Sequence, residues 1–127
     1  MVTNRVGGSI ATAAKALIVL VEAPRGIATS AEVAQAIGSH PVVVRRLLGG
    51  LRWSGLVESR SGPHGGWAIA KDPAAIRVGD VYRALDSEAA SAESALDEVL
   101  FAAEHAYVER LDQVTLADLA DADHTRK

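Results

Sequence analysis

One stretch, residues 29–69, limits the folds open to this chain more than any other. It holds two short helical patterns separated by Gly38, then two short strand patterns separated by the turn sequence SGPHGG. Glycine and proline clusters end helices and form tight turns, so the boundaries between these four elements are well marked. The order helix, turn, helix, hairpin predicts a winged helix-turn-helix, a mainly α fold with a β-hairpin wing.

The second helical pattern, residues 41–54, carries the cationic side chains of this unit. An apolar stripe at helical spacing should face inward; it consists of Val44, Leu47, Leu48 and Leu51. Arg45, Arg46 and Arg52 fall mainly on other faces, and Trp53 is expected to cover the edge of the core. Adjacent arginines in the first turns of such a helix fit guanine O6 and N7, or phosphates. A solvated arginine face is the alternative, but the neighbouring turn and hairpin favour contact with duplex DNA.

The first helical pattern, residues 31–37, is shorter and ends at Gly38, a residue suited to a left-handed helix end. Ser30 is expected to cap its start. A hydroxyl of Thr29 or Ser30, beside free backbone N–H groups, could also bind a phosphate. Plain capping explains these residues equally well, so both interpretations stay open.

The hairpin is predicted from strands over residues 56–60 and 67–70. Its glycine-rich tip, with Gly65 and Gly66, would let the backbone approach a sugar-phosphate edge. Arg60 and His64 would supply charge or hydrogen-bond donors, and Arg60 is the stronger candidate because its guanidinium is always cationic. The glycines alone are weak support, because every hairpin needs turn residues.

The net charge of −3 hides two unlike parts. Residues 1–84 contain ten Lys and Arg against five Asp and Glu, which gives +5, whereas residues 85–127 contain three against eleven, which gives −8. A basic front and an acidic back suit a DNA-binding head with an appendage held away from phosphate. We therefore predict a winged helix-turn-helix domain over residues 1–85, and a linker, long helix and short last helix over residues 86–127.

Helical patterns flank the central unit. Residues 9–23 and 77–85 are expected to pack as core helices, and residues 92–111 form a long C-terminal helix for dimerisation. An apolar seam at steps of four and three recurs along this long helix; it consists of Leu96, Leu100, Ala103, Tyr107 and Leu111. The seam could pack on its own head, but a helix-turn-helix protein that binds a palindrome needs two-fold symmetry, which favours a homodimer. Thr115 and Asp118 predict the capped start of the last helix.

Other classes of protein are disfavoured. The chain has no cysteine, and its four histidines lack the spacing of a zinc site, so we expect no metal site and no cofactor. No nucleophile stands beside a base and no paired carboxylates are suggested, so we expect no catalytic residue and no enzyme. No apolar run approaches the roughly 20 residues that span a bilayer, and no signal peptide is evident. A cytoplasmic protein that does not contact membranes is the expectation.

Four stretches carry a resemblance to a known family. They are EVAQAIG (residues 32–38), Leu47-Leu48 with Leu51 and SGLV (54–57), SRSGPHGGWAIA (59–70) followed by IRVGDV (76–81), and VTLADL (114–119). Together they resemble the bacterial winged helix-turn-helix regulators that include the iron–sulfur-cluster biogenesis repressor, the nitric-oxide-sensing repressor and the cysteine-metabolism repressor. The resemblance covers about residues 9–120.

This resemblance implies a repressor that binds a palindromic operator as a homodimer, with the helix of residues 41–54 in the major groove and the wings at flanking minor grooves. The positions that would meet DNA are Val42, Arg45, Arg46, Arg60, Gly65 and Gly66. Many members hold an iron–sulfur cluster through three cysteines, and this chain has none. It would therefore be a cluster-less member.

The signal and the alternative function stay open at this stage. A cluster-less regulator would respond to an unknown small-molecule or protein effector, or act constitutively. A small ligand would lie between the long helix and the head, near Trp53, His105 or Tyr107. The acidic second part also permits an alternative, a winged-helix module that no longer binds DNA and works through protein contacts.

Overall fold

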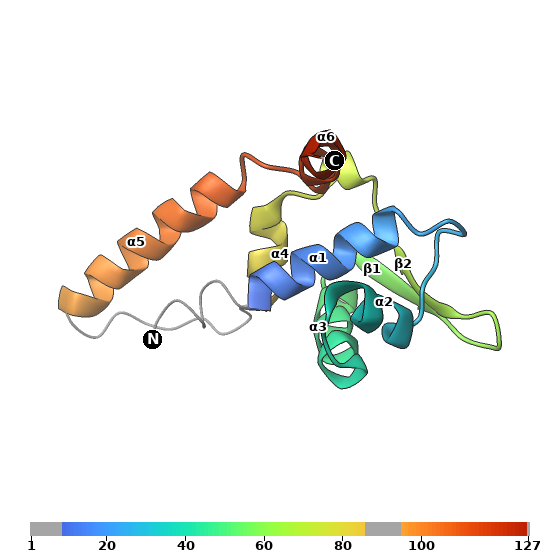
Figure 1. The fold of residues 1–127 in the computed structure, drawn as a ribbon. Helices are drawn as coiled ribbons and strands as arrows, with labels where there is room; N and C mark the ends of the chain where they lie inside the picture. Colours follow the sequence, from blue (N-terminus) through green and yellow to red (C-terminus); the bar gives the residue numbers. More distant parts are fainter. Residues whose placement is uncertain (1–8, 86–94, 127) are drawn as a thin grey trace.

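The computed structural model of this 127-residue chain describes residues 9–85 and 95–126 (Figure 1). The elements in chain order are α1 (Ser9–Val21), α2 (Ser30–Ile37), α3 (Pro41–Trp53), β1 (Val57–Arg60), β2 (Gly66–Ile69), the short 3-10 helix η2 (Pro73–Ala75), α4 (Val78–Leu85), α5 (Ala95–Leu111) and α6 (Leu116–Arg126). The predicted fold class is confirmed: the protein is mainly α-helical, with a two-stranded antiparallel hairpin. Among these described elements, no helix is both long and apolar enough to cross a bilayer.

Helix α1 lies at the centre of the head and contacts α2, α3, α4, α6 and β2. Its buried face includes Ala13, Ala16 and Leu17, none of which is exposed to solvent. Alanine side chains are short, so neighbouring helices can approach the α1 backbone closely at these positions. The helix ends at Val21, two residues earlier than the sequence predicted, and Gly26 follows with φ 73° in the turn toward α2.

Helix α2 begins one residue earlier than predicted, because Thr29 is its cap. The Thr29 hydroxyl accepts a hydrogen bond from the Glu32 backbone N–H at 3.1 Å, and the Glu32 carboxylate accepts one from the Thr29 N–H at 2.8 Å. This reciprocal capping box satisfies two backbone donors that a helix start leaves unpaired. The prediction that Ser30 caps the helix is therefore wrong, whereas the left-handed end at Gly38 is confirmed, with φ 71°.

Helix α3 buries Val44, Leu48 and Leu51 and leaves Leu47 half-buried. Its other side faces outward. The prediction that Trp53 covers the edge of the core is wrong, because 93% of this residue is exposed. The reason is geometric: Trp53 follows Val44 by nine residues, which is two and a half turns, so it points to the opposite side of the helix.

The wing pairs β1 with β2 in a register that sets Val57 opposite Ile69 and Arg60 opposite Gly66. Ala28, just before α2, adds a short third rung: its N–H and carbonyl exchange hydrogen bonds with Trp67 at 3.0 and 2.8 Å. Gly66 has φ 151°, and a Cβ there would lie 2.6 Å from the Ala28 carbonyl oxygen. The base of the wing is thereby attached directly to the start of the helix-turn-helix.

The second part of the chain leaves the head and then returns to it (Figure 1). Helix α5 extends outward, and α6 packs against α1 and η2. The first residues of the predicted long helix, 92–94, lie outside the described residues. Leu116 is fully buried, and its N–H donates to the Ile76 carbonyl at 3.0 Å. The hydrophobic core therefore does not end at residue 85, because α6 supplies part of it.

The predicted capped start of the last helix is confirmed. Thr115 and Asp118 form a second capping box, in which the Thr115 N–H donates to the Asp118 carboxylate at 3.0 Å and the Asp118 N–H donates to the Thr115 hydroxyl at 3.1 Å. Both boxes use a hydroxyl residue followed three positions later by an acid. Each of the two fixes the angle at which the chain enters a helix.

Candidate nucleic-acid interface

The outer face of α3 is the most cationic surface of any helix in the structure. This helix contains three arginines, Arg45, Arg46 and Arg52, and no acidic residue. All three arginines are exposed, and in the described ranges 9–85 and 95–126 none of them forms an ion pair. Val42, 60% exposed, lies on the same side. The arrangement offers guanidinium groups and an apolar side chain to an external anion.

The start of α2 is less suited to phosphate than the sequence suggested. The hydrogen bond from the Thr29 backbone N–H, with a smaller contribution from the Thr29 side chain, holds the pKa of the Glu32 carboxyl below its usual range, so the helix start carries its own anion. Ser30 is buried, and its hydroxyl accepts a hydrogen bond from the Trp67 indole N–H at 2.9 Å. Ser30 therefore anchors the wing, and its buried hydroxyl is less suited to a phosphate contact than the sequence suggested. The Thr29 hydroxyl is exposed but already engaged in the cap.

The wing presents an exposed tip with less free charge than α3. Arg60 pairs with Glu58 on the same strand at 3.0 Å, and both side chains are more than half exposed (58% and 51%). Such a solvent-exposed pair is weak, so a phosphate can compete for Arg60. His64 is exposed at the tip. A Cβ at Gly65 would lie 2.0 Å from the Arg60 carbonyl oxygen, so the turn itself requires glycine at this position.

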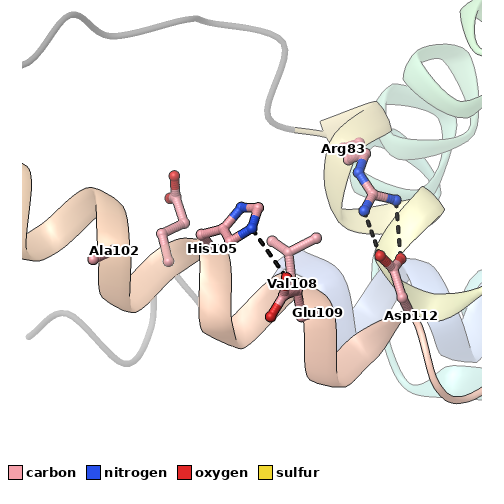
Figure 2. A pocket seen from close by; sticks show the side chains of 7 residues that line it. Arg83, Ala102, His105, Val108, Glu109 and Asp112 are labelled. Carbon is pink, nitrogen blue, oxygen red and sulfur yellow. Dashed lines mark hydrogen bonds and ion pairs between the residues drawn. The ribbon is translucent and has the colours of Figure 1, made fainter.

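The end of α5 is attached to α4 by the ion pair between Arg83 and Asp112 (Figure 2). The Arg83 guanidinium donates two hydrogen bonds to the Asp112 carboxylate, at 3.0 and 2.5 Å, and this holds the pKa of Asp112 below its usual range. A Cβ on Gly79 would lie 1.9 Å from an Asp112 oxygen, so a side chain at this position in α4 would have to displace the Asp112 carboxylate from Arg83. Sequence patterns give no signal for this contact, because its partners are 29 residues apart.

The same junction divides the predicted seam of the long helix. Tyr107 packs edge-on against Tyr82 with ring centres 5.6 Å apart, and Leu111 packs against the core of the head. These two residues therefore contact their own subunit. The earlier turns differ: Leu96 and Leu100 are 66% and 56% exposed, and Val99 between them is 64% exposed. Val99 was missed in the sequence, although its spacing of three residues from Leu96 places it on the same stripe.

A hollow of about 710 Å³ lies where α5 joins α4, and Figure 2 shows its lining. His105 is among the lining residues, as the sequence analysis suggested for an effector site, but Trp53 lies elsewhere, on α3. Four of its seven lining residues are charged, namely Arg83, Glu104, Glu109 and Asp112, so an occupant of this hollow would need polar groups as well as apolar surface.

Comparison with known proteins identifies the family to which the chain is similar. Residues 8–122 match the profile of the Rrf2 family, described as iron-dependent transcriptional regulators. Among curated relatives, YwnA of Bacillus subtilis is 39% identical over 61 residues, which is 47% of this chain and 45% of YwnA. The HTH-type transcriptional regulator CymR of the same organism is 35% identical over 83 residues, 61% of this chain and 60% of CymR. The matched region therefore spans about half of the length of these relatives.

Solved structures resemble the chain over more of its length. IscR of T. potens superimposes with a TM-score of 0.77 and 29% identity, over 96% of this chain and 90% of IscR. CymR of B. subtilis, described as the global cysteine regulator, superimposes with a TM-score of 0.65 and 29% identity, over 87% of this chain and 94% of CymR. These likenesses include α5 and α6 as well as the head.

The residues present do not fit the iron that the family description implies. An iron–sulfur cluster is held by cysteine thiolates, and this chain has no cysteine. Across the described part of the chain, no three His, Cys, Asp or Glu side chains are grouped so as to hold a metal ion. The donor set therefore matches a member of the family without a cluster.

Proposed function

This chain belongs to the Rrf2 family of transcriptional regulators, and from that premise we propose that it binds a palindromic DNA operator as a homodimer and represses transcription there. The recognition helix is α3, which enters the major groove, and the wing approaches the flanking minor groove. Residues Val42, Arg45 and Arg46 contact base edges or phosphates. Arg52, Arg60 and His64, with the backbone at Gly65 and Gly66, contribute contacts along the sugar-phosphate edge.

The observation that carries this proposal is the unneutralised cationic face of α3. Guanidinium groups recognise guanine edges and phosphates through paired hydrogen bonds. An acidic neighbour on the same helix would compete with DNA for these groups, and α3 has none. On the inner face of α3 itself, Val44, Leu48 and Leu51 are fully buried. This packing holds the helix from which the arginines project in a fixed position.

The homodimer is supported by the first turns of α5. Leu96, Val99, Leu100 and Ala103 form an exposed stripe at the spacing of one helix face. Such a stripe on a helix that extends away from its own head (Figure 1) is suited to the same stripe of a second copy. A two-fold pair would present two recognition helices to half-sites one DNA turn apart, about 34 Å.

Because this chain has no cysteine to hold an iron–sulfur cluster, the signal that it responds to differs from that of the cluster-binding members. Among the relatives, CymR is described as a cysteine regulator, and this chain would similarly respond to metabolite level or to a partner protein. Its cytoplasmic location follows from its proposed target. The junction between α4 and α5 is the position from which an effector could change the angle between the dimer helix and the head.

The test is selection of duplexes from a random pool by the purified protein at a stated salt concentration, with sequencing of the bound fraction. The proposal expects one palindrome with half-sites about one helical turn apart, and a complex of two chains per duplex. Recovery of a single unrepeated half-site would reject the dimeric arrangement. Binding that is sequence-independent, or absent even with cell extract added, would reject the regulator and favour a protein-interaction module.

A further inference from the structure

Trp53 is an aromatic side chain that the fold leaves without internal packing. It is 93% exposed, the largest exposed fraction among the exposed large apolar residues of the described chain. Tryptophan has a large apolar surface, so covering the indole with a partner would be favourable. The other tryptophan behaves differently, because Trp67 is half-buried and its indole N–H is bound to Ser30.

The position of Trp53 continues the proposed DNA-binding face. Val42, Gly49 and Trp53 are spaced by seven and four residues, so they lie along one line of α3, with Arg46 beside it. The line extends about 16 Å along the helix axis at 1.5 Å per residue. Arg52, adjacent to Trp53, and the absence of acidic residues from α3 make the flank of the indole cationic. A polyanion such as the DNA backbone is complementary to this cationic surface.

A shallow groove of about 490 Å³ lies beside the indole and is lined by Gly49, Gly50, Arg52 and Trp53. Neither glycine has a positive φ, and a Cβ at either position would have no neighbour within 4 Å. Nothing in the described ranges 9–85 and 95–126 therefore requires glycine there, although glycine is among the least favourable residues in a helix. An external backbone that approaches α3 closely would require it.

We propose that Trp53 is a further DNA-contacting residue, with its indole against the sugar-phosphate backbone at the edge of the major groove and that backbone lying in the groove over Gly49 and Gly50. This deepens, and rests on, the proposed DNA binding by α3. The contact is apolar and shape-dependent, so it positions the recognition helix along the groove axis. It complements the arginines, which bind through charge.

The experiment uses the duplex that the wild-type protein selects. Acrylamide quenches exposed tryptophan, so fluorescence of the free protein should show one accessible and one protected indole. Adding duplex should protect the accessible one. Trp53→Phe, which retains only Trp67, supplies the reference signal and should show no change in accessibility when duplex is added. An indole that stays equally quenchable in the complex overturns the proposal.

Affinity measurements test the energetic role. Trp53→Ala should weaken duplex binding about tenfold, with little change in Tm and in the salt dependence, because no charge and no internal contact is lost. Gly49→Ala should raise Tm, because alanine favours the helix and its Cβ meets nothing, yet weaken binding. If Gly49→Ala raises both the Tm and the affinity for duplex, or leaves the affinity unchanged, the DNA backbone does not approach α3 closely at this position.

The two proposals fail in distinguishable ways. If wild-type protein binds no duplex, the proposed function fails and this inference fails with it. If wild-type protein and Trp53→Ala bind the selected duplex equally, only the role of Trp53 is rejected. In that case the exposed indole belongs to a protein contact.

Discussion

The head and the first half of α5 use the same helical periodicity for opposite purposes. In the head, apolar residues such as Leu17, Leu48 and Val81 are fully buried, whereas Leu96 and Leu100 of α5 are more than half exposed. The charges are opposite too, with +5 for residues 1–84 and −8 for residues 85–127. The difference indicates that the head is complete within one chain, and that the outer half of α5 needs a partner.

The largest contrast should come from matched leucine truncations. Leu48→Ala removes a fully buried side chain and should lower the free energy of unfolding by about 2–5 kcal/mol. Leu100→Ala, at an exposed site on α5, should leave the unfolding of the dilute monomer nearly unchanged but weaken dimerisation. Chemical denaturation and sedimentation at several concentrations measure the two effects. A large loss of monomer stability in Leu100→Ala would mean that α5 packs within its own subunit.

A second contrast separates cationic groups by location. Replacing both Arg45 and Arg46 with alanine should weaken operator binding by a factor of about one hundred, since each well-placed guanidinium contributes about 1–3 kcal/mol. Thermal stability should not change, because both side chains are exposed. Arg110→Ala, at the end of α5, is the control for loss of positive charge. The double variant removes two charges and the control removes one, so an equal loss of binding free energy per removed charge would assign the effect to net charge alone.

Salt should act in opposite directions on the two regions. Raising ionic strength weakens contacts between the arginine face and phosphate. It also screens the repulsion between two acidic α5 helices, so dimerisation should strengthen a few-fold between roughly 0.05 and 0.5 M salt. Analytical ultracentrifugation without DNA follows the second effect. Dimerisation that weakens with salt would indicate an interface built on ion pairs and would exclude the apolar stripe as its main element.

The smallest effect concerns the junction between α4 and α5. Because Arg83 lowers the folded-state pKa of Asp112 below its ordinary value of 3.8, the ionised pair stabilises the fold above about pH 3.8, and this stabilisation is lost as the pH falls below that value. Wild-type protein should therefore lose slightly more stability than Arg83→Ala between pH 5 and pH 3. The pair is partly exposed, so the difference is small. If the stability of wild-type protein and of Arg83→Ala falls by the same amount between pH 5 and pH 3, the junction does not depend on this ion pair.

Local patterns in the sequence predicted the elements that depend on neighbouring residues. The hairpin, the glycine end of α2 and the Thr115 cap all follow from residues within a few positions of one another, and the structure confirms them. Helix phase was harder, because Trp53 looked like a core residue from its type, whereas its position in the turn sends it outward. Side-chain type alone does not fix which face a residue occupies.

The site was less predictable than the fold because it depends on contacts between distant residues. Ser30 was expected either to cap α2 or to bind a phosphate, but its hydroxyl accepts a hydrogen bond from Trp67, 37 residues away. The sequence predicted one continuous apolar seam along α5. The packing of Tyr107 on Tyr82 shows that the last turns of this seam contact the same subunit, whereas the first turns are exposed. DNA contact by α3 and by the wing stays a prediction.

The return of α6 to the head has a consequence for how the protein is made. Leu116 completes the core, yet the ribosome adds it about thirty residues after the end of α4, which corresponds to a delay of roughly 2–6 s at 5–20 residues per second. During that interval the nascent head lacks the side chain that covers Ile76 and α1, and the apolar stripe of α5 emerges before the core is closed. Co-translational folding of this chain should therefore finish only when α6 arrives, so the helix-turn-helix head and α5 reach their final structure together.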